Sequence, residues 1–212
     1  MRTVIIIIAF VLAMGMANVQ AEIIWDSGHH VFSEGSETYV TMLNDASADI
    51  TGGWIWEFHM LNDTTADITG GEIGQLLCYD TSEVFVYEPS EIDLLRPNDS
   101  STANVYGGTI NGLFTLGDSV TNIYEASLNF VDAVDSSTIN MYVESYNWNP
   151  TGGKWGDGLL TGIWLNTSHL FSIEIIDLQT INHINFVPEP SMMSLLVIGS
   201  LMLRTIKRKT RR

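Results

Sequence analysis

The feature that most constrains the fold of this chain is a repeat of about 18 residues that runs from position 44 to position 146. The string Ala48–Gly53 (ADITGG) returns unchanged as Ala66–Gly71. Four weaker copies follow, and the successive intervals are 18, 18, 19, 18 and 18 residues, which is consistent with one inserted residue at a turn. A near-constant period over six copies is typical of a solenoid, in which each unit stacks on its neighbours to bury its apolar side.

Three apolar columns appear when the copies are aligned: Ile50, Ile68, Val86, Val105, Ile123 and Met141; then Ile55, Ile73, Ile92, Ile110 and Leu128; then Phe58, Leu76, Leu95, Leu113 and Val131. Within a copy, apolar and polar residues alternate, as in a strand with one buried face. We therefore predict an all-β chain, a single parallel β-solenoid of about six 18-residue coils. An antiparallel β-sandwich is the alternative, because regularly spaced short strands also suit that fold, but the column register favours the solenoid.

The N-terminal residues 1–21 have the pattern of a signal peptide. Arg2 precedes an apolar run, and Val19–Ala21 is a small-residue cleavage site, so the mature chain is expected to begin near Glu22. An uncleaved N-terminal anchor is the alternative. Residues 22–43 do not match the repeat and are expected to form an N-terminal cap. The adjacent His29 and His30 would point to opposite sides of a strand, so a metal site there is disfavoured.

The repeat ends near Asn147, and residues 147–186 are expected to form a C-terminal β cap of the same domain. The alternating segments 159–165 and 171–176 predict a hairpin around the turn at 166–168, and 181–187 predicts one more strand.

The formal net charge of −16 hides an uneven distribution. Between Glu22 and Val187 there are 24 acidic residues against only Arg96 and Lys154, a net charge of −22. Such a surface repels nucleic acid, so no nucleic-acid partner is expected. Cys78 is the single cysteine, which precludes an intramolecular disulfide, and we expect it to be a buried thiol rather than a reactive one.

The segment 187–212 has three parts: the motif Pro188, Glu189 and Pro190, an apolar run over 192–203, and a basic cluster. An apolar run that ends in positive charge is a stop-transfer pattern and predicts a transmembrane helix, although the run is short. The basic residues are Arg204, Lys207, Arg208, Lys209, Arg211 and Arg212.

This tail resembles the PEP-CTERM sorting signal of Gram-negative bacteria. The resemblance covers about the last 25 residues, with Gly199 alone in place of the usual glycine-rich helix. It implies export, retention in the inner membrane, processing by an exosortase, and association with the cell surface and extracellular polysaccharide matrix. The repeat region loosely resembles the β-solenoid domains of such proteins, which implies no functional residues. An ordinary C-terminal membrane anchor is the alternative.

One further column is a candidate ligand face: Thr51, Thr69, Tyr87, Tyr106, Tyr124 and Tyr142. Hydroxyl and aromatic ladders can bind sugars or ice, although an outward stack is also favourable through cross-strand pairing alone. The change from Thr to Tyr after two copies weakens the match to ice. Acidic columns could chelate calcium, but the glycine–aspartate nonapeptide of calcium-binding solenoids is absent and Asp also suits turns. Their members are Asp45, Asp63, Thr81, Ser100, Asp118 and Ser136, and Asp49, Asp67, Asn104, Asn122 and Asn140.

Polysaccharide-degrading enzymes need grouped carboxylates, or a carboxylate with a cation for acidic sugars. Asp132 and Asp135 are a candidate pair, but they fall in a turn, and no hydrolase, zinc or phosphate-loop motif is present. The sequence therefore predicts a non-enzymatic, exported structural or adhesive protein without cofactor or metal. Its expected partners are an exosortase, the membrane and extracellular polysaccharide. A carbohydrate- or ice-binding module is the alternative, and a polysaccharide-degrading enzyme is less favoured.

Overall fold

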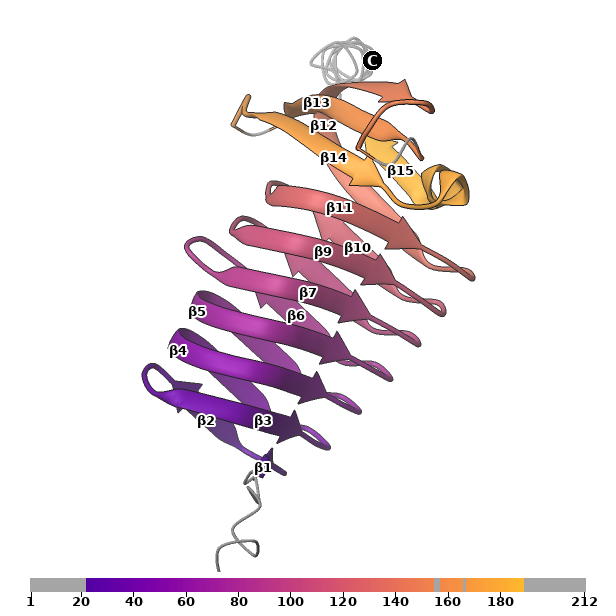
Figure 1. Cartoon of the computed structure of the whole chain (residues 1–212). Coiled ribbons are helices and arrows are strands. Elements are labelled where there is room, and N and C mark those ends of the chain that lie inside the picture. The colour runs from indigo at the N-terminus through magenta and orange to yellow at the C-terminus, as the bar shows by residue number, and fades with distance from the viewer. Residues whose placement is uncertain (1–21, 155–156, 166, 189–212) are drawn as a thin grey trace, which may run out of the picture.

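The computed structural model describes residues 22–154, 157–165 and 167–188. The fold is all-β, a β-solenoid of about seven turns (Figure 1). The predicted all-β solenoid is thus confirmed, with about one turn more than the repeat count indicates. The signal peptide predicted for residues 1–21 lies outside the described residues, as do Glu189, Pro190, the apolar run and the basic cluster of the tail. In the described segments, no helix is long and apolar enough to cross a membrane.

Each coil contributes a strand to each of two parallel layers, seen as the front and back rows of arrows in Figure 1. The strands β4 (Ser47–Met60) and β5 (Thr65–Cys78) run through both layers. Later coils are split into two strands by a short connection. The back layer contains β6 (Glu83–Val86), β8 (Thr102–Val105), β10 (Val120–Ile123) and the first part of β12 (Thr138–Asn149). The front layer contains β7 (Glu91–Pro97), β9 (Thr109–Thr115) and β11 (Ser127–Ala133).

The repeated Gly-Gly pair makes the bend between the layers in β4 and β5. Gly53 and Gly71 have φ of 78° and 84°, a region that L side chains rarely adopt. A Cβ on Gly70 would lie 2.7 Å from the carbonyl oxygen of Thr51 in the coil below. Glycine is therefore required both for the bend and for the close approach of the two coils.

The pairing of strands follows the repeat. Ile50 pairs with Ile68 and Ile55 with Ile73, an offset of 18 residues. The one interval of 19 residues appears where Ile73 pairs with Ile92, so the inserted residue lies between β6 and β7. All residues of the three predicted columns are buried, with at most 5% of any of them exposed. Each fully buried side chain contributes about 1.5–3 kcal/mol, so these stacks dominate the stability of the solenoid.

The segment 22–43 requires a correction, because it follows the repeat. The strands β2 (His29–Phe32) and β3 (Ser36–Met42) pair with β4 at the same 18-residue offset, and β1 (Glu22–Trp25) pairs with β3. This register is not apparent in the sequence, because Glu37 interrupts the apolar column at the position that Ile55 holds in the next coil. The segment is still the first coil of the described stack, and it accounts for the additional turn.

The C-terminal segment changes the direction of pairing. β12 continues to Asn149 and pairs antiparallel with β13 (Leu159–Trp164), which pairs antiparallel with β14 (Leu170–Ile175), so the predicted hairpin is present. A 3₁₀ helix, η1 (Leu178–His183), replaces the first half of the predicted last strand. The Asp177 carboxylate caps this helix by accepting from the Gln179 N–H at 2.8 Å. The remaining strand, β15 (Ile184–Val187), returns to the back layer beside β12.

Candidate functional site

Four of the six predicted face residues form a tyrosine stack along the back layer. The ring centroids of Tyr87 and Tyr106 lie 5.2 Å apart, those of Tyr106 and Tyr124 4.6 Å, and those of Tyr124 and Tyr142 4.2 Å. The planes of neighbouring rings differ by 10°, 6° and 13°. This spacing is close to the distance of about 4.8 Å between neighbouring strands, so the stack is a direct consequence of one tyrosine per coil.

The tyrosines point outward because each follows a buried residue of the first core column, as Tyr106 follows Val105. A side-chain hydrogen bond with Tyr124 raises the pKa of the Tyr142 hydroxyl, and partial burial and the charge of Tyr124 add to the effect.

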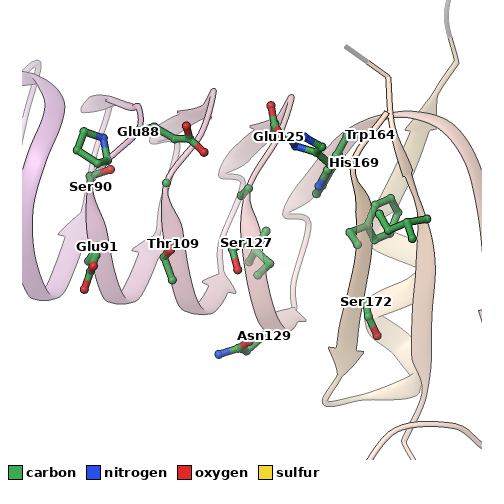
Figure 2. Close-up of a pocket in the computed structure, with 16 residues that line it drawn as sticks. Glu88, Ser90, Glu91, Thr109, Glu125, Ser127, Asn129, Trp164, His169 and Ser172 are labelled. Atoms are coloured by element: carbon green, nitrogen blue, oxygen red, sulfur yellow. Dashed lines mark hydrogen bonds and ion pairs between the residues drawn. The ribbon is translucent and has the colours of Figure 1, made fainter. Parts of the chain in front are cut away.

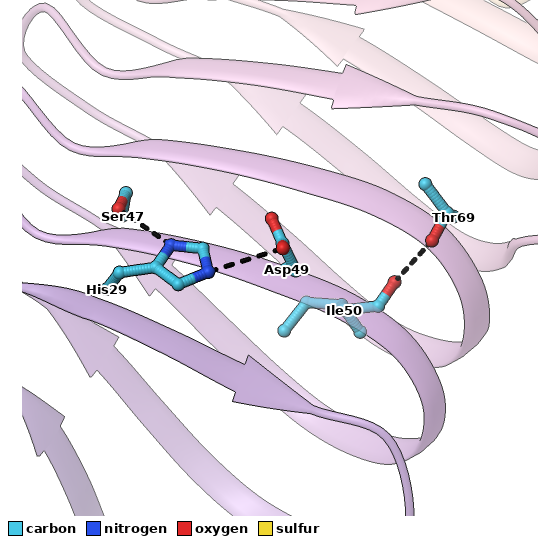
Figure 3. A network of polar contacts seen from close by, with 5 residues as sticks. All are labelled: His29, Ser47, Asp49, Ile50 and Thr69. Atoms are coloured by element: carbon cyan, nitrogen blue, oxygen red, sulfur yellow. Dashed lines mark hydrogen bonds and ion pairs between the residues drawn. The ribbon is translucent and has the colours of Figure 1, made fainter.

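The two threonines of the predicted face do not join this stack. Thr51 and Thr69 are exposed at the Gly-Gly bends, where the register shifts so that Thr51 pairs with Gly70. The Thr69 hydroxyl instead donates to the carbonyl oxygen of Ile50 at 3.5 Å (Figure 3). The predicted six-member column is thus a four-member tyrosine stack with two separate threonines.

An asparagine ladder runs beside the tyrosines on the same outer side. The Nδ2 of Asn122 donates to the Oδ1 of Asn104 at 2.9 Å, Asn140 donates to Asn122 at 2.9 Å, and Asn185 donates to Asn140 at 3.2 Å. At its lower end, Asn104 donates to a Glu83 carboxylate oxygen at 2.8 Å. We call this surface the asparagine–tyrosine face, made of Tyr87, Tyr106, Tyr124, Tyr142, Asn104, Asn122, Asn140 and Asn185.

The geometry of this face limits what it can bind. Tyr106 and Tyr124 each stack on a neighbouring ring on both sides, so their flat sides are occupied and their edges and hydroxyls point outward. The face therefore offers hydrogen-bonding groups at coil spacing rather than flat rings on which a sugar could stack. It is also mostly neutral in a domain whose remaining surface is strongly acidic.

Several residues of the candidate calcium columns bond to protein groups: the side chains of Asn104, Asn122 and Asn140 bond to one another in the ladder, and Asp49 contacts His29. In the turns beside the first column, Asn62, Asp80 and Asp99 adopt positive φ, and the Oδ2 of Asp80 accepts from the Asn62 N–H of the coil below at 2.9 Å. The Asp63 carboxylate accepts from the Thr81 hydroxyl. Among the described residues, no group of three or more His, Cys, Asp or Glu is placed to hold a metal ion.

The two adjacent histidines point in different directions. His29 Nε2 lies 3.3 Å from an Asp49 carboxylate oxygen, and its Nδ1 lies 3.1 Å from the Ser47 hydroxyl (Figure 3). The His30 ring stacks on Trp25 at 4.9 Å. His29 therefore joins the first coil to the second, His30 packs on Trp25, and the two side chains do not converge on one site.

The candidate carboxylate pair and the cysteine also have structural environments. Asp132 accepts from the Thr180 hydroxyl at 2.9 Å, and Asp135 accepts from the Gly117 N–H at 3.4 Å. Cys78 is fully buried, as predicted, with its Sγ 4.0 Å from the Sδ of Met60. Burial raises the pKa of its thiol to about 12.

A cleft of about 580 Å³, which the sequence analysis did not predict, lies between the solenoid and the C-terminal hairpin (Figure 2). The solenoid side contributes the carboxylates of Glu88, Glu91 and Glu125, and the hairpin contributes the side chains of His169 and Leu170. His169 Nδ1 lies 2.6 Å from a Glu125 carboxylate oxygen and so joins the two sides. The only sequence signal for this cleft is the end of the repeat, which does not say which residues would face it.

Comparison with protein-family models, with curated proteins and with solved structures gives no match for this chain.

Proposed function

We propose that this protein is an exported structural or adhesive element of the bacterial cell surface or extracellular matrix, and that it acts without catalysis. The observation that carries this proposal is the use of repeated polar and aromatic groups to hold coil to coil. Tyrosine faces, asparagine amides and turn carboxylates are bonded to their equivalents in the neighbouring coil. A stack built in this way is a stiff spacer with a regular outer surface.

The localisation in this proposal rests on the sequence pattern at the two ends of the chain. The signal peptide directs export, the apolar run and basic cluster hold the chain in the membrane, and an exosortase processes it near Pro188. Surface labelling of intact cells should be lost both after deletion of residues 188–212 and after the combined change of Pro188→Ala, Glu189→Gln and Pro190→Ala. Unchanged labelling of both variants would contradict the proposed role of residues 188–212 in bringing the protein to the cell surface. Loss with the deletion alone would indicate an ordinary membrane anchor.

Adhesion would use the asparagine–tyrosine face, whose outward tyrosine hydroxyls can hydrogen-bond to polysaccharide. Co-sedimentation with purified matrix polysaccharide should be reduced by Tyr106→Ala combined with Tyr124→Ala. Tyr146→Ala is the matched control, because Tyr146 is about half exposed and stacks on Phe186 outside the face. Equal binding by all variants would remove the adhesive role of this face and leave the structural one.

A dedicated carbohydrate- or ice-binding module is the second candidate function, favoured by the regular row of tyrosine hydroxyls. Replacement of Tyr106 and Tyr124 by phenylalanine keeps the stacked rings and removes two hydroxyls. Loss of glycan-array or ice binding in that variant would support this candidate. A polysaccharide-degrading activity is the least favoured function, and an assay for reducing ends released from matrix polysaccharide decides it.

A further inference from the structure

The cleft lies where a parallel strand ladder stops. Within the described chain, β11 pairs with β9 through six residues but with β14 only through Phe130 and Val131. A continued ladder would place Ser127–Asn129 beside Phe171–Ile173, but the two strands separate there. Leu128 and Asn129 of β11 and Leu170–Ser172 of β14 line the cleft on its two sides.

This arrangement leaves one edge of each strand without a strand neighbour. Ser127 is held on the other side of β11, where its N–H donates to the Gly108 carbonyl oxygen at 3.0 Å. β14 is likewise paired with β13 on its far side. Strand edges present backbone N–H and C=O groups that another extended chain can pair with. A volume of about 580 Å³ is also within the range of about 300–1,000 Å³ for ligand sites.

The side chains around the cleft specify the charge of the occupant. Glu88 and Glu91 lie at the corner where β7 begins, and Glu125 lies at the corner before β11, two coils further along. No lysine or arginine is among the described residues that line the cleft. The hairpin side adds Leu170, which is 82% exposed. The cleft therefore combines negative charge, an apolar contact and open strand edges.

We propose that this cleft binds an extended basic peptide segment of a partner protein, which adds as a strand between β11 and β14. Its backbone would pair with the open edges, and an apolar side chain would contact Leu170. One lysine or arginine side chain would meet Glu125, and basic residues that extend beyond the added strand towards β7 would meet Glu88 and Glu91. Peptide is favoured over polysaccharide because only a polypeptide backbone continues the interrupted ladder. This inference is independent of the polysaccharide-binding role of the asparagine–tyrosine face.

The test uses the full-length protein in detergent and a fluorescent short peptide of alternating lysine and valine. We expect saturable binding that weakens as salt is added. Two matched probes separate the contributions: an alternating glutamate–valine peptide changes the charge, and the lysine–valine peptide N-methylated at alternate amides removes backbone donors. Both probes should bind more weakly than the unmodified lysine–valine peptide. Equal binding of the N-methylated peptide would overturn strand addition.

Variants locate the site. Glu88→Gln with Glu91→Gln should weaken binding by about fivefold, the expected effect of losing two exposed ion pairs. Asp67→Asn with Asp118→Asn makes the same charge change at exposed positions outside the cleft and should leave binding unchanged. Equal weakening by both pairs would mean non-specific charge attraction and would overturn the proposal.

Hydrogen exchange supplies the third readout. Bound peptide should slow amide exchange within residues 127–129 and 170–172, while the back layer is unaffected. Protection elsewhere, or the same protection by a neutral oligosaccharide, would overturn the proposal in favour of another site or of a carbohydrate cleft.

Discussion

The regular coils and the C-terminal hairpin use similar residues in different ways. In the coils, the nearest neighbour of a side chain is its equivalent about 18 residues away, so tyrosines stack on tyrosines and asparagines bond to asparagines. In the hairpin, antiparallel pairing brings unlike residues together, such as Leu160 and Ile173. The comparison shows that the repeat pairs polar groups with their equivalents in the next coil, whereas the break in the repeat leaves parts of β11 and β14 without a strand neighbour in the part of the chain that the structure describes.

The largest expected difference between the two regions is in their response to loss of a leucine. Leu76→Ala should lower the free energy of unfolding by about 2–5 kcal/mol, because it creates a cavity in a fully buried column. Leu170→Ala should have almost no effect, because this side chain is exposed. Urea unfolding of both variants checks the pair. A large loss for Leu170→Ala would show that the hairpin is packed more tightly than the structure indicates.

Position within the tyrosine stack should matter next. Tyr106→Ala should cost about 1–3 kcal/mol, because it removes two stacked pairs of about 0.5–1.5 kcal/mol each. Tyr87→Ala removes one such pair and should cost about half as much. Equal costs at the two positions in thermal or urea unfolding would mean that stacking between coils contributes little.

The asparagine ladder should give a smaller effect. Asn122→Ala breaks two side-chain hydrogen bonds and should cost about 1–2 kcal/mol. Asn182→Ala is the control outside the coils, since Asn182 donates one exposed bond to Gln179 at 3.1 Å, and it should cost less than about 0.5 kcal/mol. Indistinguishable unfolding midpoints for the two variants would argue against a cooperative ladder.

The smallest expected effect is the change in folding stability that the Cys78 thiol causes when the pH is raised slightly above neutral. Because the folded-state pKa of Cys78 is raised from 9.0 to about 12, its contribution to stability is fully present below pH 9 and is lost as the pH rises towards 12. At pH 8, iodoacetamide should label the thiol only after unfolding in urea. Rapid labelling of the native protein would contradict its burial.

Much of the solenoid could be predicted from the sequence, because residues that contact one another in a stacked fold recur at a constant spacing along the chain. Ile50, Ile68 and Ile123 fall in one column and occupy one buried stack. The segment 22–43 is predicted as a cap, but its 18-residue register is not apparent in the sequence, because Glu37 interrupts the apolar pattern while backbone pairing continues. Thr51 and Thr69 were placed in the tyrosine column because periodicity does not reveal the register shift at a Gly-Gly bend. The cleft depends on how far β14 separates from β11, which is set by tertiary packing and has no periodic signal.

The most direct test of the central claim, that equivalent residues of successive coils lie on top of one another, is nuclear Overhauser spectroscopy of the isotopically labelled protein. Ring protons of Tyr106 and Tyr124, and methyl protons of Ile50 and Ile68, should give strong cross-peaks, since each pair is separated by one coil. Absence of both contacts in a folded sample, with each residue instead close to residues at unrelated positions, would contradict the stacked solenoid.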